Sequence, residues 1–299
     1  MAGSPNIEAH PPPVDTGKRH PIYWFEDGTL VLRVEDVLFN IHRGFLNGLS
    51  SYLKSACEQL PKGKADHLDL DPSRGIASRD VETLLQVIYH DLSLSPQTPF
   101  HQLASVLRAS SPEQFDIPLF FTQATQSLYK TIPSGPVPNY RHDNLEEALI
   151  LATEYQLDGI RATLLYAVMI ADDVRIEQSS EASPNGAIAP PSKLPTHIEE
   201  LTTKLMTKTI DLFSPTLFTA PATPHMACTS TFAEHWLRLV IEPGIADQGV
   251  YKPLESLERF KNIDWASHGL CPSCVKEKGE EWTEEQNSYW RLLDAWIDG

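Results

Sequence analysis

The sequence predicts an α+β domain, a small sheet covered by helices, followed by a mostly α-helical C-terminal region. Apolar residues occupy every second position within 30–34 and again within 37–41, which is the period of β-strands. Within 81–88 and 145–168 they recur every three or four positions, which is the period of helices that bury one face. Beyond residue 198 the helical period continues in short stretches.

The first elements are predicted to be a hairpin followed by helices. Strands 30–34 and 37–41 are separated only by Glu35 and Asp36, so we expect them to pair antiparallel. Two short helices then span 42–57, with apolar residues that we expect to face inward: Phe45, Leu46, Leu49, Tyr52 and Leu53. Leu68 and Leu70 mark a third strand. Ser78 is expected to cap the next helix, whose apolar stripe is Val81, Leu84, Leu85 and Ile88.

The second half of the chain is predicted to be helical. Asp143 and Glu146 have the spacing of a capping box, and a helix pair follows within 145–168. Thr283 and Gln286 form a second capping box, so we expect the last helix to begin there. A binding surface is one interpretation of the aromatic residues near it, and core packing is the one we favour: Trp282, Tyr289, Trp290 and Trp296.

Polar and proline-rich stretches divide the chain. Residues 1–21 offer little to bury and are expected to be a disordered arm, and residues 172–197 have the Ser, Pro and Gly content of a linker. The first domain then covers residues 22–171, and the helical C-terminal region covers residues 198–299.

The proline-rich stretch at about 93–143 is less regular than its surroundings. It also contains apolar residues, among them Leu103 and Phe115. We expect one short helix at 100–109 and a loop at 132–142, because prolines interrupt regular structure elsewhere in this stretch.

Composition and charge narrow the functional classes. The 40 acidic residues exceed the 24 basic ones, for a net charge of −16, so we expect neither nucleic acid nor a membrane as a direct partner. The N-terminus lacks the apolar stretch of a signal peptide, and the longest apolar run, 164–171, is too short to span a bilayer. Four cysteines in 299 residues do not form the disulfide framework that is typical of small secreted proteins. We therefore predict an intracellular protein, in the cytoplasm, the nucleus or both.

Residues 24–58 resemble the opening of a BTB/POZ domain. The family pattern has an acidic residue before the first strand, a hairpin ending in Phe-x-x-His, then Leu and Ser-x-Tyr-Phe. These positions are filled here by Asp27, Phe39, His42, Leu46, Ser50 and Tyr52, with Leu53 in place of the usual Phe. Residues 84–90 and 144–168 resemble the later helices of the family. The Trp-x-x-Asp-Gly at 24–28, with a C-terminal Cys-x-x-Cys and then Trp-x-x-Leu, is similar to BTB proteins of mushroom-forming (basidiomycete) fungi.

The resemblance implies a fold and a role. Asp27, Phe39, His42, Leu46 and Tyr52 would be structural residues of the family motif, and the stretch at about 93–143 would be an insertion. The proline-rich arm leaves no room for the N-terminal helix that many dimeric members exchange. The role would be that of an adaptor or scaffold that binds other proteins or itself, including a substrate receptor for a cullin-type ubiquitin ligase. A nuclear transcription regulator that acts through partners is the alternative.

His42 is the residue that most suggests catalysis. A histidine at the end of a strand can serve as a general base. The sequence offers no serine or cysteine nucleophile with an Asp partner beside it, and the resemblance implies instead a ring that is packed and hydrogen-bonded. We therefore predict that the protein is not an enzyme and has no catalytic residue.

Cys271-Pro-Ser-Cys274 is the local motif that most specifically indicates a site. Its two thiolates are one half of a zinc site, and His225 with Cys228, at the same offset, would complete a Cys3His set. A redox pair is another interpretation, but the residues before Cys271 lack the pattern of the parallel strand that it needs. Because the chain has a single Cys-x-x-Cys and His225 lies in a proline-flanked loop, the sequence favours free structural thiols. We predict no metal and no other cofactor.

Overall fold

The structure, a computed structural model, describes residues 17–59, 66–180 and 194–298. The chain forms two compact units, residues 1–128 and residues 129–299. The expected disorder of the arm at 1–16 lies outside the described residues, and so do residues 181–193 of the linker that the sequence places at 172–197. The described part corrects that linker, because residues 172–180 continue helix α7 (Asp158–Ser180) and residues 196–197 begin helix α8 (Thr196–Phe218).

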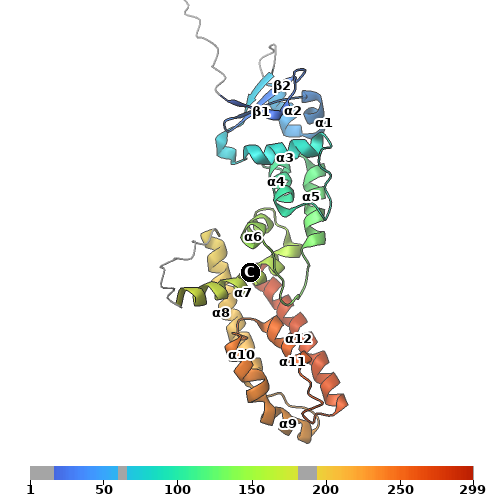
Figure 1. Ribbon diagram of the computed structural model, residues 1–299, viewed down its shortest axis with the longest axis vertical. Coiled ribbons are helices and arrows are strands. Elements are labelled where there is room, and N and C mark those ends of the chain that lie inside the picture. Colours follow the sequence, from blue (N-terminus) through green and yellow to red (C-terminus); the bar gives the residue numbers. More distant parts are fainter. Residues whose placement is uncertain (1–16, 60–65, 181–193, 299) are drawn as a thin grey trace, which may run out of the picture. The chain divides into compact units, whose positions relative to one another are not determined.

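A four-stranded sheet lies at one end of the first unit (Figure 1). The order of its strands is β1-β3-β2-β4. Its strands are β1 (Lys18–Trp24), β2 (Leu30–Val34), β3 (Val37–Ile41) and β4 (Asp66–Asp69). Strands β2 and β3 pair antiparallel with Leu32 opposite Phe39, which confirms the predicted hairpin. Strands β1 and β4 pair parallel to β3 and β2, respectively. The sheet is therefore mixed: the two central strands form an antiparallel hairpin, and each edge strand runs parallel to its neighbour.

Strand β1 corrects the predicted extent of the arm. Residues 18–21, which the sequence places in a disordered arm, are the first part of this strand, in which His20 and Tyr23 are buried. Pro21 lacks a backbone N–H, but it is tolerated because β1 is an edge strand of the sheet. The proline content that suggested disorder is thus compatible with an edge.

The turn between β2 and β3 also caps a helix. Glu35 adopts a left-handed conformation with φ of 54°, and its carboxylate accepts hydrogen bonds from the Ser78 backbone N–H at 3.0 Å and from the Ser78 hydroxyl at 2.7 Å. Ser78 is the first residue of α3 (Ser78–Ile88) and not its cap. The predicted capping role of Ser78 is therefore wrong, since Glu35 from the turn supplies the acceptor. These hydrogen bonds lower the pKa of Glu35.

The helices of the first unit follow the predicted stripes in part. Short helices α1 (Arg43–Leu49) and α2 (Ser51–Glu58) lead to a 3-10 turn (Pro72–Arg74) and to α3, whose predicted stripe is buried. The predicted helix at 100–109 is confirmed as α4 (Phe100–Ser110). Helix α5 (Pro118–Thr131) was not predicted. Its first residue is a proline, which suits the first turn of a helix, so prolines here mark where helices begin.

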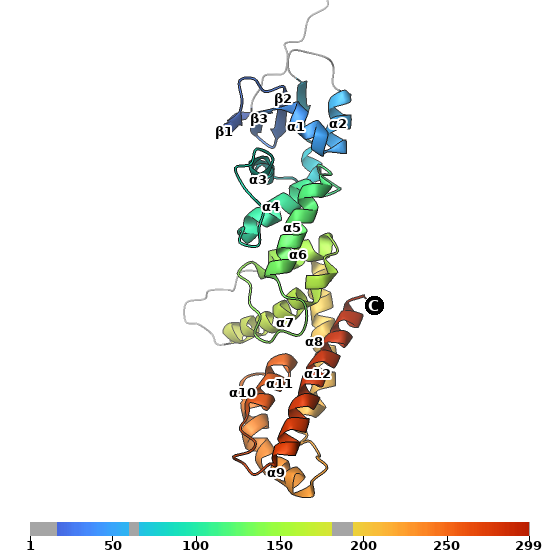
Figure 2. The same cartoon turned by 90° about the vertical axis from the view of Figure 1, so that its right-hand side faces the viewer.

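Helices make up the second unit, as predicted (Figure 2). They are α6 (Leu145–Glu154), α7 (Asp158–Ser180), α8 (Thr196–Phe218), α9 (Met226–Trp236), a π-helical turn (Leu237–Ile241), α10 (Glu242–Ala246), α11 (Pro253–Asn262) and α12 (Pro272–Asp298). Helix α12 begins at Pro272 and not at Thr283, so the expected start is wrong. Residues 272–282, including Gly279, form the first turns of this helix.

The position of α6 and α7 differs from the predicted domain boundaries. The sequence assigns residues 145–168 to a domain that ends at residue 171, whereas the two units divide between residues 128 and 129. Helix α7 packs against α8 and α12. The hydroxyl of buried Tyr166 donates to Glu255 and accepts from the Leu254 backbone N–H at 3.3 Å. Besides α6, helix α7 thus packs against helices that come later in the chain.

An aromatic core fills the second unit at the end where α9 and α12 begin. Phe232, Trp236, Phe260, Trp265 and Trp282 are buried and lie ring against ring, with centroid separations from 4.7 to 6.2 Å among them. Tyr289 and Trp290 are buried as well, which confirms core packing for three of the four aromatic residues of the last helix, while Trp296 stays partly exposed.

No helix in the described part of the chain combines the length and the apolarity that crossing a membrane requires.

Candidate functional site

His42 lies between β3 and α1, where two side chains hold its ring. Its Nδ1 is 2.9 Å from the Tyr89 hydroxyl, which also accepts a hydrogen bond from the His42 backbone N–H at 3.1 Å. Its Nε2 is 3.3 Å from a carboxylate oxygen of Asp27. The side chain is 29% exposed, so it is half-buried. Both ring nitrogens face structural partners, neither of which is a serine or cysteine nucleophile.

Aromatic rings surround His42 and continue to the surface. The rings of Phe25 and Phe45 lie 4.9 and 5.9 Å from its ring, and both also pack on Tyr89. Burial raises the pKa of the Tyr89 hydroxyl, so this group remains a protonated donor. Phe45 is 56% exposed, which corrects its expected inward position. Because Phe45 and buried Leu46 are consecutive in a helix, their side chains point about 100° apart and only one can face the core.

The other residues of the sequence motif occupy different surroundings. Phe39 and Leu46 are buried in the core of the first unit. The Tyr52 ring is partly exposed and stacks on the guanidinium group of Arg74 at 4.2 Å. Asp27 is exposed beside His42. The structural role that the sequence assigns to these residues stays a prediction.

A second candidate site joins the starts of two helices in the second unit. His225 directly precedes α9, and Cys228 lies in the first turn of that helix. Cys271 directly precedes α12, and Cys274 lies in its first turn. Each pair thus has the spacing at which a residue before a helix and one in its first turn approach each other. Cys274 therefore belongs to the last helix, which the sequence predicts to begin only at Thr283.

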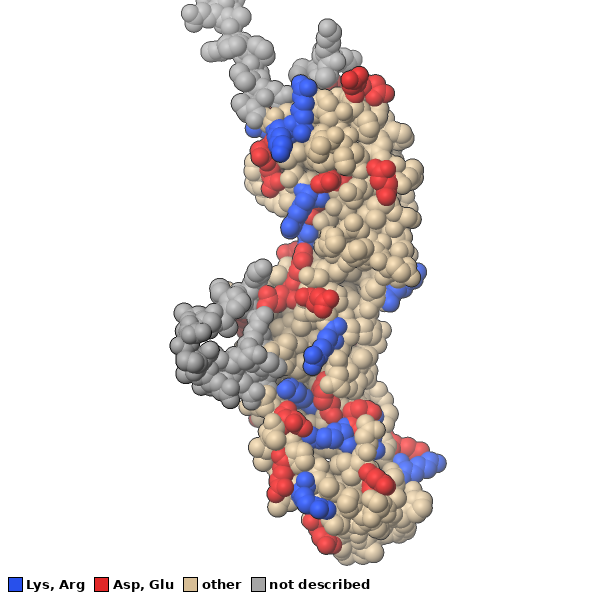
Figure 3. All heavy atoms as spheres, in the orientation of Figure 1, with Lys and Arg blue, Asp and Glu red and all other residues tan. Residues whose placement is uncertain are grey.

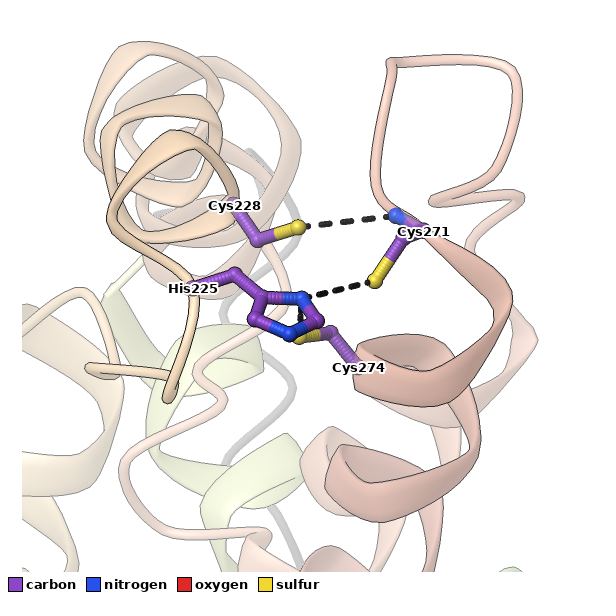
Figure 4. A group of neighbouring side chains, drawn as sticks. All are labelled: His225, Cys228, Cys271 and Cys274. Atoms are coloured by element: carbon purple, nitrogen blue, oxygen red, sulfur yellow. Dashed lines mark hydrogen bonds between the residues drawn. The ribbon is translucent and has the colours of Figure 1, made fainter.

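The four side chains point toward one another (Figure 4). His225 Nδ1 lies 3.1 Å from the Cys271 sulfur and 3.5 Å from the Cys274 sulfur, and the Cys271 backbone N–H donates to the Cys228 sulfur at 3.5 Å. All four candidate ligand atoms are within 4.8 Å of one another. Cys228 and Cys274 are buried, Cys271 is half-buried and His225 is exposed.

The surroundings of this cluster favour negative charge on sulfur. The Cys274 backbone N–H and the His225 ring bond the Cys271 sulfur and lower its pKa to about 6. Burial acts in the opposite direction on Cys274, whose pKa is raised. Two helix N-termini, with their unpaired N–H groups, converge on the cluster, which favours anionic side chains there. The set can therefore bind a cation, form a disulfide or remain as free thiols.

Local geometry and the aromatic core bring the two halves of this cluster together. Gly269 has φ of 100°, which a side chain rarely allows, and the turn around it directs the chain from Trp265 to Cys271. Cys228 and Cys274 belong to the same buried cluster as Phe232 and Trp282. The sequence named all four residues, but it could not place them side by side, because residues 229–270 separate the pairs.

A sequence model of the BTB/POZ domain matches residues 26–132. Residues 26–132 are a BTB/POZ domain. No curated protein and no solved structure shows significant similarity to the chain.

The BTB match differs from the predicted boundaries at its C-terminal side. It includes residues 93–132, most of the stretch that we expect to be an insertion, and it ends before α6 and α7. BTB domains are protein-interaction modules. The chain therefore consists of a BTB domain with a small four-stranded sheet, followed by a helical C-terminal region.

Proposed function

We propose that the protein is a non-catalytic intracellular adaptor whose BTB domain binds a cullin-type ubiquitin ligase and whose helical unit binds the substrate protein. The BTB domain supports a role in protein interaction. The resemblance to BTB adaptors points to the ligase as the first partner.

Exposed Phe45 is the observation that carries this proposal. A phenylalanine with more than half of its surface in water gains free energy when a partner covers it, and aromatic residues are favoured at the centres of interfaces. Phe45 is also held in place, because its ring packs on His42 and Tyr89. A rigid aromatic side chain loses little conformational freedom on binding.

Charge supports protein partners over nucleic acid. The net charge is −16. On the face shown in Figure 3, acidic and basic side chains of the described residues alternate, and no broad basic patch gathers there. Phosphate-rich partners would meet repulsion, whereas a protein surface of mixed charge would not.

Binding of the full-length protein to a purified BTB-binding cullin tests the proposal. We expect a 1:1 complex per chain for the wild type and at least about tenfold weaker binding for Phe45→Glu, since this is the loss that a central aromatic anchor produces. The matched control is Leu212→Glu, which changes an exposed apolar residue on α8 and should bind like the wild type. Circular dichroism verifies that both variants are folded.

The alternative role, a nuclear transcription regulator acting through partners, predicts a different result. In that case the wild type does not bind the cullin at micromolar concentration. If the wild type and Phe45→Glu bind the cullin equally well, the ligase is still the partner, but its contact surface does not include this face of α1.

A further inference from the structure

The His225, Cys228, Cys271 and Cys274 cluster has the composition and the geometry of a metal site. We propose that these four side chains bind one zinc ion, which holds the start of α9 to the start of α12. The sequence predicts free thiols at these positions, and the convergence of four ligand atoms changes that interpretation.

The distances fit a small cation. Zinc–sulfur bonds of about 2.3 Å and a zinc–nitrogen bond of about 2.0 Å place a tetrahedral nitrogen and sulfur about 3.5 Å apart and two sulfur atoms about 3.8 Å apart. His225 Nδ1 lies 3.1 and 3.5 Å from two of the sulfur atoms, and no pair of ligand atoms is more than 4.8 Å apart. Side-chain adjustments that shorten these separations by about 1 Å or less therefore suffice for tetrahedral coordination.

The identity of the ligands selects zinc among the common cations. Three thiolates and one imidazole form a soft donor set, which disfavours magnesium and calcium. All four positions of the tetrahedron come from the protein, so no position is left for water or substrate. This is the arrangement of structural zinc sites, whereas catalytic zinc keeps an open position.

Hydrogen bonds and helix ends offset the charge of the bound state. Three thiolates with Zn²⁺ and neutral histidine leave one net negative charge. The Cys271 backbone N–H already donates to the Cys228 sulfur at 3.5 Å. The N-termini of α9 and α12 add further positive potential at the same place. Such donors orient the ligands and stabilise the anionic centre.

The arrangement explains why the cluster lies beside the aromatic core. Cys228 and Cys274 are buried next to Phe232, Trp265 and Trp282, so a metal bonded to both would fix the end of this core. The metal–ligand bonds would connect the short helix α9 to the long helix α12. The two ligand pairs lie far apart in the sequence, so a bound zinc ion would close a long loop of the chain. Such a link stabilises the folded state, because it restricts the conformations of the chain and because the four ligands converge only in the folded protein.

Metal analysis of the full-length protein tests the proposal. The protein is produced with zinc in the medium, purified without chelator and measured by inductively coupled plasma mass spectrometry. We expect about one tightly held zinc ion per chain, and at least about a tenfold lower content in Cys271→Ser and in His225→Ala. The matched control is Cys57→Ser, since Cys57 lies in α2 and is the one cysteine outside the cluster. It should retain the metal.

Two further measurements separate coordination from a general loss of folding. His225→Cys should retain zinc, because a fourth thiolate is also a good ligand, and exposed His225 can be changed without opening the core. Cobalt in place of zinc should give the absorption bands of tetrahedral thiolate coordination. Wild-type protein without zinc, with a melting temperature that does not respond to added zinc or to chelator, would overturn the proposal. So would a Cys271–Cys274 disulfide as the dominant form after purification under argon.

Discussion

Single residues in this protein take their roles from partners that are distant in sequence. His42 was the strongest candidate for catalysis in the sequence, yet its ring nitrogens face Tyr89 and Asp27, which hold the ring in place. Glu35 is a turn residue whose carboxylate accepts a hydrogen bond from the first backbone N–H of α3. In both cases the residue type permits several roles, and the neighbour decides among them.

Replacing His42 with Ala should lower the free energy of unfolding by about 1–3 kcal/mol, because it removes the hydrogen bond to Tyr89 and the ring contacts of a half-buried side chain. Urea unfolding measures the change. His67→Ala is the control: the His67 side chain on β4 is 44% exposed and lies 3.7 Å from the exposed carboxylate of Asp69, so little change is expected. Equal stability of both variants would contradict the packing role of His42.

Elements are joined by a few buried polar contacts as well as by apolar stripes. Helices α3 and α4 pack closely, and the Arg108 guanidinium bonds both carboxylate oxygens of Asp80 at 3.1 Å. Asp80 is almost fully buried and Arg108 is 22% exposed. This pair is not visible in the sequence, because both residues lie on otherwise ordinary amphipathic helices.

Arg108→Ala should destabilise the first unit by about 3 kcal/mol, because it leaves the Asp80 carboxylate buried without its bidentate partner. Arg79→Ala is a matched control, since Arg79 also approaches Asp80, at 3.9 Å, but its side chain is 74% exposed. Such an exposed pair contributes at most about 1 kcal/mol. Thermal unfolding followed by circular dichroism compares the two, and a larger effect of Arg79→Ala would reverse this ranking.

At the scale of the whole molecule, the chain is a BTB domain and a helical unit whose division differs from the one expected. Helix α7 belongs to the helical unit because its buried face meets α8, α11 and α12. Tyr166 provides the polar part of that contact through Glu255 and the Leu254 backbone. Burial raises the pKa of Tyr166 well above its ordinary value, so its hydroxyl remains a donor at all physiological pH values.

Tyr166→Phe should destabilise the helical unit by about 1–3 kcal/mol, since the Leu254 N–H and the Glu255 carboxylate lose a buried partner while the ring is kept. Hydrogen exchange should show the loss of protection in α7 and α11 and leave the BTB domain unchanged. The control is Tyr251→Phe, which removes a hydroxyl that has no hydrogen bond in the described residues. Loss of protection in β2 and β3 instead would place α7 with the BTB domain, as the sequence suggested.

The sequence by itself determined the elements whose signal is local. The period of two at 30–41 and the stripe at 81–88 predicted the hairpin and α3, and the order of motifs around Asp27, Phe39 and His42 identified the BTB domain. The two ligand pairs were also visible, because each spans only four residues.

Only the tertiary structure decided which local elements meet. The periodicity of α7 shows that one face is buried but not against what, so its unit was mispredicted. The exposure of Phe45 depends on where the short helix α1 ends and which face it turns to the sheet. The four ligands come together because the aromatic core packs α9 against the start of α12 across a long intervening segment. Contacts of that kind follow from the packing of whole faces, which no window of sequence contains.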